Sequence, residues 1–230
     1  MINNNEYMNL MKANKYYLTS YITPKNKKYI DIIFNKDIDL SVYNNLTHLY
    51  FDDNLNQEID LSKNINLEYL EFGWNFNSKI NLLNNINLKN LFFGWDFNQN
   101  INLSNNNNLI CLEINGDYNK NIIIPKSVEK LKLNCCDNQY IIDNFHNNIK
   151  ELHILSCYDL NLYNLPNSIK KLYIEEYFEP LNNLPNSIEY LEINIYHLKI
   201  KKIPKNLKTI KCDRYYPYID DFKDYEVIYH

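Results

Sequence analysis

The sequence lacks the features on which many enzymes and membrane proteins are built. Only 3 of its 230 residues are glycine, too few for the glycine-rich loops that cradle phosphate groups. Neither a HExxH metalloprotease motif nor a nucleophile elbow is present. No apolar run reaches the about 18 residues of a membrane-spanning helix, and the N-terminal residues lack the apolar core of a signal peptide. We therefore predict a soluble, intracellular protein without enzymatic activity, cofactor or membrane association.

The sequence also lacks a basic charge excess and a paired cysteine framework. The formal net charge is −4 and the pI is about 5.8, which argues against a dedicated nucleic-acid-binding protein. The five cysteines are an odd number without regular spacing, so we expect free thiols rather than disulfides.

Asparagine and tyrosine are unusually abundant, with 43 and 21 residues respectively. The asparagines are spaced between apolar residues, and the longest run is Asn105 to Asn108, so a low-complexity tract is not indicated. We interpret most of them as turn residues, because asparagine tolerates positive φ better than any residue except glycine.

A repeated phrase, apolar-x-x-apolar-x-apolar, organises most of the chain. Nine copies are spaced by 19 to 21 residues and begin at Leu46, Leu67, Leu88, Leu109, Val128, Ile149, Ile169, Ile188 and Leu207. In the first copies a second apolar phrase, such as Ile59 and Leu61, recurs with the same period as the first. In the C-terminal half, Pro125, Pro166, Pro185 and Pro204 each stand three residues before the leading apolar residue. Periods of this length are typical of solenoid proteins.

The period predicts a mainly β protein. About 20 residues are too few for a strand, a crossover helix and a return, so each unit is one coil containing a short strand. We expect a right-handed parallel β-solenoid of leucine-rich-repeat type with nine to ten coils. With strands about 4.8 Å apart it would be a rod roughly 45 Å long. We assign residues 1–29 to an N-terminal cap with an amphipathic helix at Glu6–Ile22, residues 30–212 to the solenoid, and residues 213–230 to an off-register C-terminal cap.

The stretch FGWNFN, beginning at Phe72, returns as FGWDFN at Phe93. The first phenylalanines continue the buried alternation, and Phe76 and Phe97 are expected to stack in the next corner. The intervening glycines would allow the turn. We therefore attribute the repeated phenylalanines and glycines of this stretch to the requirements of the fold.

Several units resemble FNIP repeats, a leucine-rich-repeat-like family of giant DNA viruses and social amoebae. The resemblance rests on FEPLNNLPNSIEYLEI (Phe178 to Ile193), LYNLPNSIKKLYI (Leu162 to Ile174) and FGWDFNQNINL (Phe93 to Leu103). Members often carry an F-box before the repeats, so the resemblance implies a substrate receptor of the host ubiquitin machinery, in the host cytoplasm if the protein is viral. The residues before the first unit contain no recognisable F-box.

The outward positions of the repeated phrase form the predicted partner-binding surface. Its N-terminal part is aromatic and acidic, with Tyr50, Tyr69, Glu71, Phe92 and Glu113 edged by Trp74 and Trp95. Contiguous exposed aromatic side chains are typical anchors of protein interfaces, although β-propensity and cross-strand pairing explain the same residues. We expect a monomeric, non-enzymatic protein-interaction module. The alternatives are a glycan-binding solenoid that uses stacked Trp74 and Trp95, and a purely structural repeat protein.

Two further clusters favour structural roles. Cys136 and Cys157 occupy the same position in consecutive units, and we interpret them as a packed thiol ladder, because zinc needs four tetrahedral ligands and only two histidines lie near. Glu71 and Glu113 are two coils apart, a distance that acid–base catalysis allows, but no pocket is implied. We therefore predict neither a metal site nor a catalytic site.

Overall fold

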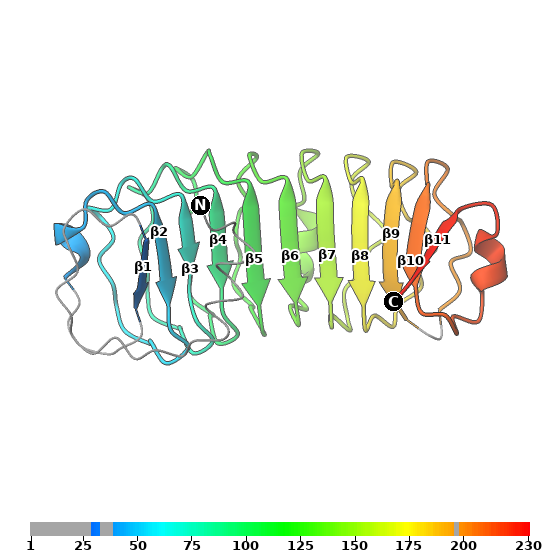
Figure 1. Ribbon diagram of the computed structural model, residues 1–230, viewed down its shortest axis with the longest axis horizontal. Helices are drawn as coiled ribbons and strands as arrows, with labels where there is room; N and C mark the ends of the chain where they lie inside the picture. The colour runs from blue at the N-terminus through cyan, green and yellow to red at the C-terminus, as the bar shows by residue number, and fades with distance from the viewer. Residues whose placement is uncertain (1–28, 33–38, 196–197) are drawn as a thin grey trace.

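The chain forms a solenoid built on one long parallel β-sheet (Figure 1). The computed structural model describes residues 29–32, 39–195 and 198–230. The strands are β1 (Tyr29–Ile32), β2 (His48–Phe51), β3 (Tyr69–Glu71), β4 (Asn90–Phe93), β5 (Cys111–Asn115), β6 (Lys130–Asn134), β7 (Glu151–Leu155), β8 (Lys171–Glu175), β9 (Tyr190–Asn194), β10 (Thr209–Cys212) and β11 (Glu226–Tyr229). The helical elements are the short α-helix α2 (Gln139–Asp143) and the 3-10 helices η1 (Leu40–Val42) and η2 (Ile219–Phe222).

The eleven strands lie in sequence order, and every neighbouring pair is parallel. The register follows the repeat, so that His48 pairs with Tyr69, Tyr69 with Asn90 and Asn90 with Cys111. In Figure 1 the strands face the viewer, point downward and advance from left to right, which makes the winding right-handed. The predicted β-solenoid is confirmed.

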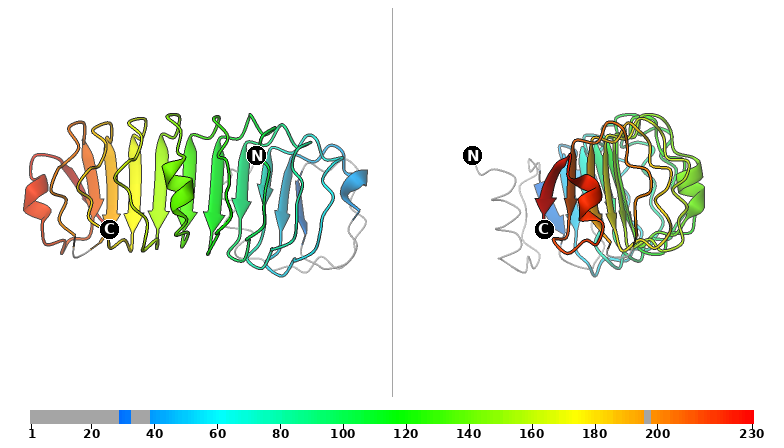
Figure 2. Two further views of the ribbon diagram at one scale, coloured as in Figure 1. Left: turned by 180° about the vertical axis from the view of Figure 1, so that it is seen from behind. Right: turned by 90° about the vertical axis from the view of Figure 1, so that its right-hand side faces the viewer.

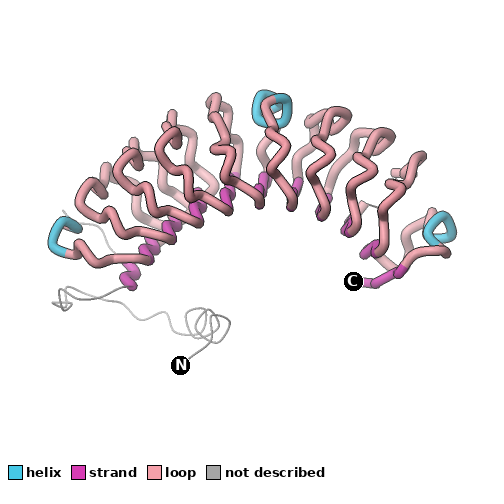
Figure 3. Tube along the Cα trace, turned by 90° about the horizontal axis from the view of Figure 1, so that it is seen from above, coloured by secondary structure: helices cyan, strands magenta, loops and turns pink. Residues whose placement is uncertain are grey.

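We expected a rod, and the solenoid is bent into an arc (Figure 3). The strands line its concave side and the connecting loops form its convex side (Figure 3). Helix α2 lies behind the sheet on the convex side (Figure 2). Strands in a sheet are held about 4.8 Å apart by their hydrogen bonds, whereas the loops and α2 take more room. The sheet therefore curves toward its own strands.

The core lies between the strands and the returning loops of each coil. In the second complete unit Leu67, Leu70 and Phe72 are at most 3% exposed, while Tyr69 and Glu71 between them point outward. The second apolar phrase packs into the core as well, with Ile59 partly buried and Leu61 fully buried. Within the described residues it forms only the isolated bridge between Ile59 and Ile80. Each coil thus has one true strand, and neighbouring coils complete its core.

The repeated FGW phrase is explained by stacking and by close backbone approach. Phe72 stacks on Phe93 with ring centroids 5.4 Å apart, and Phe76 stacks on Phe97 at 6.0 Å. A Cβ atom on Gly94 would lie 2.0 Å from the carbonyl oxygen of Gly73 in the preceding coil. Glycine is therefore required because the neighbouring backbone occupies the space of a side chain.

Buried asparagines join the first coils. Asn64, Asn85 and Asn106 are fully buried, and the side-chain amide of each donates hydrogen bonds to two backbone carbonyl oxygens of the preceding coil. Many other asparagines lie in turns, as we expected, for example Asn66 and Asn87, but the positive φ that we gave as the reason was wrong. The non-glycine residues with positive φ in the described chain are Cys135, Ser156 and Glu176.

The two units that follow Asn106 contact the equivalent carbonyl oxygens with other side chains. Pro125 occupies the position of Asn106 in the next unit, and the hydroxyl of Ser127 lies 3.4 Å from the carbonyl oxygen of Asn106. His146 occupies the equivalent position in the following unit, and its Nε2 contacts the carbonyl oxygen of Pro125 at 2.9 Å. In these two units Ser127 and His146 thus reach the carbonyl position that the asparagines contact in the first coils. In later units Ser168 and Ser187 donate instead to the carbonyl oxygens of Ile149 and Ile169.

The C-terminal segment differs from the expected off-register stretch. Residues 213–230 contain η2 and also β11, which pairs in register with β10 through Thr209 and Glu226. Tyr216 and Phe222 fill the last part of the core. The helix predicted at Glu6–Ile22 lies outside the described residues.

Candidate functional site

The concave face of the sheet displays two parallel rows of side chains, most of them half-buried. The first row is His48, Tyr69, Asn90, Cys111, Lys130, Glu151, Lys171, Tyr190, Thr209 and Glu226. The second row is Tyr50, Glu71, Phe92, Glu113, Lys132, His153, Tyr173, Glu192, Lys211 and Ile228. Because the strands pair without slippage, members of one row are neighbours across the sheet.

An aromatic cluster around Tyr69 occupies the N-terminal end of this face. The Tyr69 ring lies 4.8 Å from the ring of Tyr50, 5.1 Å from Phe92 and 5.7 Å from His48. Its hydroxyl donates a 2.5 Å hydrogen bond to Glu71. Burial, together with this carboxylate, raises the pKa of Tyr69 above its ordinary value. The structure thus brings four of the predicted binding residues together.

Glu113, the fifth predicted residue of the face, belongs to a charged network in the centre. It forms an ion pair with Lys132 on β6 at 2.9 Å. Glu151 on β7 forms an ion pair with Lys130 on β6 at 2.7 Å. His153 lies 2.9 Å from Glu151 through Nε2 and stacks flat on Tyr173 at 3.9 Å. The centre of the concave face is therefore polar and internally paired.

The protonation states in this network follow from burial and from the pairs. Burial lowers the pKa of His153, and Lys130 and Lys132 act in the same direction, while the hydrogen bond to Glu151 opposes them. Burial would raise the pKa of Glu151, but hydrogen bonds from His153 and Lys130 outweigh it and hold that pKa below its ordinary value. At neutral pH a neutral His153 therefore donates its Nε2 hydrogen to an ionised Glu151.

The same tyrosine–glutamate arrangement recurs at the C-terminal end of the face. Tyr190 donates to Glu192 at 2.7 Å, as Tyr69 does to Glu71, and Lys211 also contacts Glu192 at 3.1 Å. Burial would raise the pKa of Glu192, but these two partners outweigh it and hold the pKa below its ordinary value.

A groove of about 880 Å³ runs along the concave face from β4 to the C-terminal residues. It is lined by Asn90, Phe92, Ile110, Cys111, Glu113, Lys130, Lys132, His153, Leu155, Tyr173, Ile174, Glu175, Glu192, Asn194 and His230. The sequence prediction missed its C-terminal part because it followed aromatic contiguity. The signal was present, since Lys132, His153 and Tyr173 hold the same repeat position as Phe92 and Glu113.

Trp74 and Trp95 lie beyond the ends of β3 and β4, at the rim of the sheet, rather than on the concave face. Trp74 is 60% exposed and Trp95 is half-buried. Their ring centroids are 5.9 Å apart and the planes are inclined by 49°. The two rings are therefore adjacent, as predicted from their repeat position, but they do not form one flat surface.

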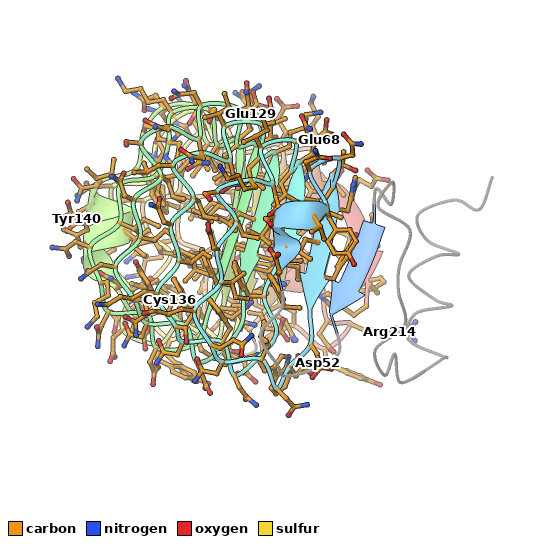
Figure 4. The ribbon with its side chains drawn as sticks, turned by 90° about the vertical axis from the view of Figure 1, so that its left-hand side faces the viewer. Asp52, Glu68, Glu129, Cys136, Tyr140 and Arg214 are labelled. Atoms are coloured by element: carbon orange, nitrogen blue, oxygen red, sulfur yellow. The ribbon has the colours of Figure 1, made fainter. Side chains whose placement is uncertain are left out.

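The two rims of the sheet differ in their ion pairs. Glu68 and Glu129 lie at the rim where the strands begin, and Asp52 lies at the rim where they end (Figure 4). At the strand-start rim Glu68 pairs with Lys89 at 2.9 Å and Glu129 with Lys150 at 2.6 Å. A second groove, of about 650 Å³, lies at the strand-end rim.

The five cysteines are free thiols. Cys136 and Cys157 are fully buried, and burial raises their pKa values to about 11 and about 12. The Cys136 thiol contacts the carbonyl oxygen of Tyr118 at 3.6 Å. In the part of the chain that the structure describes, no three potential ligands gather closely enough to hold a metal ion. No helix there has the length and apolar character needed to cross a membrane.

No protein-family model matches the sequence, and no curated protein matches it. Among solved structures, the functional domain of InlJ from Listeria monocytogenes, which includes a cysteine ladder, is similar with a TM-score of 0.48 and 18% identity, covering 81% of this chain and 39% of the other. CroV588, described as a novel circular LRR protein structure, is similar with a TM-score of 0.42 and 23% identity, covering 85% and 41% respectively. The chain thus spans about two fifths of the length of either structure.

Proposed function

We propose that the chain is a non-enzymatic scaffold that binds a protein partner on its concave strand face. One observation carries this proposal: two in-register rows of side chains border an open groove of about 880 Å³. A rigid sheet can present such rows without the entropic cost of ordering loops. Tyr69 and Phe92 are the proposed aromatic anchors at one end, and Tyr173 is the anchor near the centre.

The chemistry of the carboxylates supports binding rather than catalysis. A general acid needs a raised pKa near the working pH, whereas the pKa values of Glu151 and Glu192 are lowered by their partners. Glu113, which we considered as one member of an acid–base pair, is engaged by Lys132. Ion-paired carboxylates of this kind supply orientation and charge complementarity at an interface.

The resemblance to FNIP repeats extends the proposal to the ubiquitin machinery. If the chain is a substrate adaptor, the partner set should contain ubiquitin-ligase subunits. This finer assignment rests on the repeat phrases alone and is separate from the proposal that the concave face binds protein.

A glycan-binding function is the second candidate, because Trp74 is 60% exposed beside Trp95. The inclination of 49° between the two rings weighs against a platform for one flat sugar face. Glycan-array binding that is lost in a Trp74→Leu variant would favour this function over the protein scaffold.

An affinity capture from host-cell lysate with two matched variants tests the scaffold proposal. The face variant carries Phe92→Ser, Lys171→Ser and Tyr173→Ser. The control variant changes exposed residues outside the strands, namely Ile123→Ser, Tyr140→Ser and Tyr163→Ser. A partner retained by the wild type and the control, and bound at least about tenfold more weakly by the face variant, is the expected result. A partner lost only by the control would place the binding surface elsewhere.

A further inference from the structure

A row of carboxylates follows the ends of successive strands. Asp96, Asp117, Asp137 and Asp159 come after β4, β5, β6 and β7, and all four are exposed. Because the strands are parallel, these ends meet at one rim (Figure 1). None of the four forms an ion pair with any residue that the structure describes. The Asp137 carboxylate accepts a 3.3 Å hydrogen bond from the backbone N–H of Asp159 in the next coil. Like charges in adjacent coils repel one another, and no cation of the described residues offsets this repulsion through an ion pair.

The strand-start rim shows that the repeat readily pairs its charges between coils. There Glu189 contacts both Lys170 at 3.0 Å and Lys208 at 2.6 Å, in addition to the pairs made by Glu68 and Glu129. The uncompensated row at the opposite rim is therefore a local property and not a general consequence of the coil spacing.

Aromatic rings accompany the unpaired carboxylates. The groove of about 650 Å³ at this rim is lined by Trp95 and Tyr158 together with Asp96, Asp117 and Asp137. Trp74, the most exposed tryptophan, adjoins Trp95. Aromatic faces attract ammonium and guanidinium groups through the ring quadrupole, and carboxylates bind the same groups through charge-assisted hydrogen bonds. A groove with both kinds of wall is suited to lysine and arginine side chains.

The spacing of the row favours an extended cationic chain over a single ion. The carboxylates recur once per coil, and no three of the described potential ligands come close enough together to hold one metal ion. Parallel strands are about 4.8 Å apart, and an extended peptide advances about 3.3 Å per residue. Long, flexible lysine and arginine side chains can bridge this difference.

From these observations we propose that the strand-end rim from β4 to β7 binds an extended lysine- and arginine-rich segment of a partner protein. Asp96, Asp117 and Asp137 pair with the cationic groups, and the rings of Trp95 and Tyr158 cover the side-chain stems and heads. This surface is distinct from the concave face, so it provides a second contact area that does not depend on the scaffold proposal.

The test uses the full chain and a fluorescein-labelled peptide of alternating lysine and alanine, with fluorescence anisotropy as the readout. We expect saturable binding that weakens as the salt concentration rises from about 0.05 M to about 0.15 M. The triple variant D96N/D117N/D137N should bind at least about tenfold more weakly, because it removes three charge pairs. A peptide of alternating glutamate and alanine should not bind.

A charge-matched control separates the groove from general attraction to an acidic protein. The variant D143N/D220N/D224N changes the net charge by the same amount at exposed positions outside the groove, and its affinity should change by less than about twofold. Equal weakening by both triple variants, or absence of saturable binding by the wild type, would overturn the proposal.

The aromatic contribution is tested without changing the charge. Tyr158→Leu should weaken peptide binding by about threefold, whereas Tyr158→Phe should not, because the ring and not the hydroxyl contacts the cation. Equal affinities of the two variants would remove Tyr158 from the site. The concave-face variant described above should bind the peptide normally, and loss of binding there would contradict the separation of the two surfaces.

Discussion

Asn85 donates a 3.0 Å hydrogen bond from its side-chain amide to the backbone carbonyl oxygen of Asn64, the residue at the same position one coil earlier. Asn106 repeats the bond onto Asn85 at 2.9 Å. Both asparagines are fully buried. The ladder supplies donors to loop carbonyls that no strand can reach, and it thereby fixes the loops of consecutive coils to each other.

Replacing Asn85 by alanine should lower the free energy of unfolding by about 1–3 kcal/mol, because the carbonyl oxygens of Leu61 and Asn64 each lose one of their two hydrogen bonds. The loss of stability stays moderate because the Asn85 Oδ1 atom has no hydrogen-bond partner in the described structure. Removing this oxygen therefore breaks no hydrogen bond. Urea unfolding measures the difference. Asn107→Ala, a change at an exposed asparagine next to the ladder residue Asn106, should change stability by at most about 0.5 kcal/mol. Equal effects of the two changes would argue against the ladder.

Gly94→Ala should destabilise the protein by about 3 kcal/mol. The new Cβ atom would lie 2.0 Å from the Gly73 carbonyl oxygen, and this contact is with backbone, which cannot move aside as a side chain can. Thermal unfolding followed by circular dichroism is the measurement. An unchanged midpoint would mean that adjacent coils separate more easily than the structure indicates.

Cys135→Gly should stabilise the protein by about 0.5–1 kcal/mol. Cys135 has φ of 54°, and glycine adopts this left-handed conformation without the steric cost that other residues pay. The preceding coil has Gly116 with φ of 72° at the corresponding position. Urea midpoints provide the comparison, and Asn134→Gly in the regular strand β6 should show the opposite sign.

Stability should fall as the pH decreases below about 6.5. Burial lowers the pKa values of His48 and His153 in the folded protein, so the unfolded chain binds more protons in this range. The free energy of unfolding is therefore highest above the unfolded histidine pKa and decreases as the pH falls through the window beneath it. His153→Gln should flatten this decrease while keeping a donor for Glu151. Urea unfolding between about pH 7.5 and about pH 5 tests it, and identical slopes for wild type and variant would exclude His153 as a cause.

Alkylation of the folded protein should be faster at the half-buried Cys135 than at the buried Cys136 and Cys157. Burial raises the pKa values of Cys136 and Cys157 to about 11 and about 12, so at about pH 8 both remain protonated and shielded. Iodoacetamide should modify the half-buried Cys135 first, and Cys136 and Cys157 should react only after unfolding. Peptide mapping by mass spectrometry gives the order. Early modification of Cys157 in the folded protein would show that these coils open readily.

The repeat predicted the fold because a single pattern is written nine times in the sequence. Alternation placed Leu70 and Phe72 in the core, and the register of the copies predicted that Tyr69 and Asn90 would be neighbours. The curvature was not predictable in this way. It depends on how much room the loops and α2 need on the convex side, which spacing alone does not reveal.

The candidate site was predicted only at its N-terminal end. Aromatic contiguity identified Tyr69 and Phe92, which do lie together. The charged centre around Glu151 and His153 was missed because pairing between coils turns scattered charges into a network. The buried asparagines Asn85 and Asn106 were misassigned for a related reason, since a side chain that bonds to the previous coil resembles a turn residue in a linear sequence.

In the part of the chain that the structure describes, each strand of the sheet pairs only with the strands that precede and follow it. A molecule held at its two ends and stretched would therefore lose coils one at a time from an end, while the remaining coils kept their contacts. Each detached coil of about 20 residues would add about 70 Å of length. Under mechanical load the solenoid would behave as an extensible tether that lengthens in regular steps.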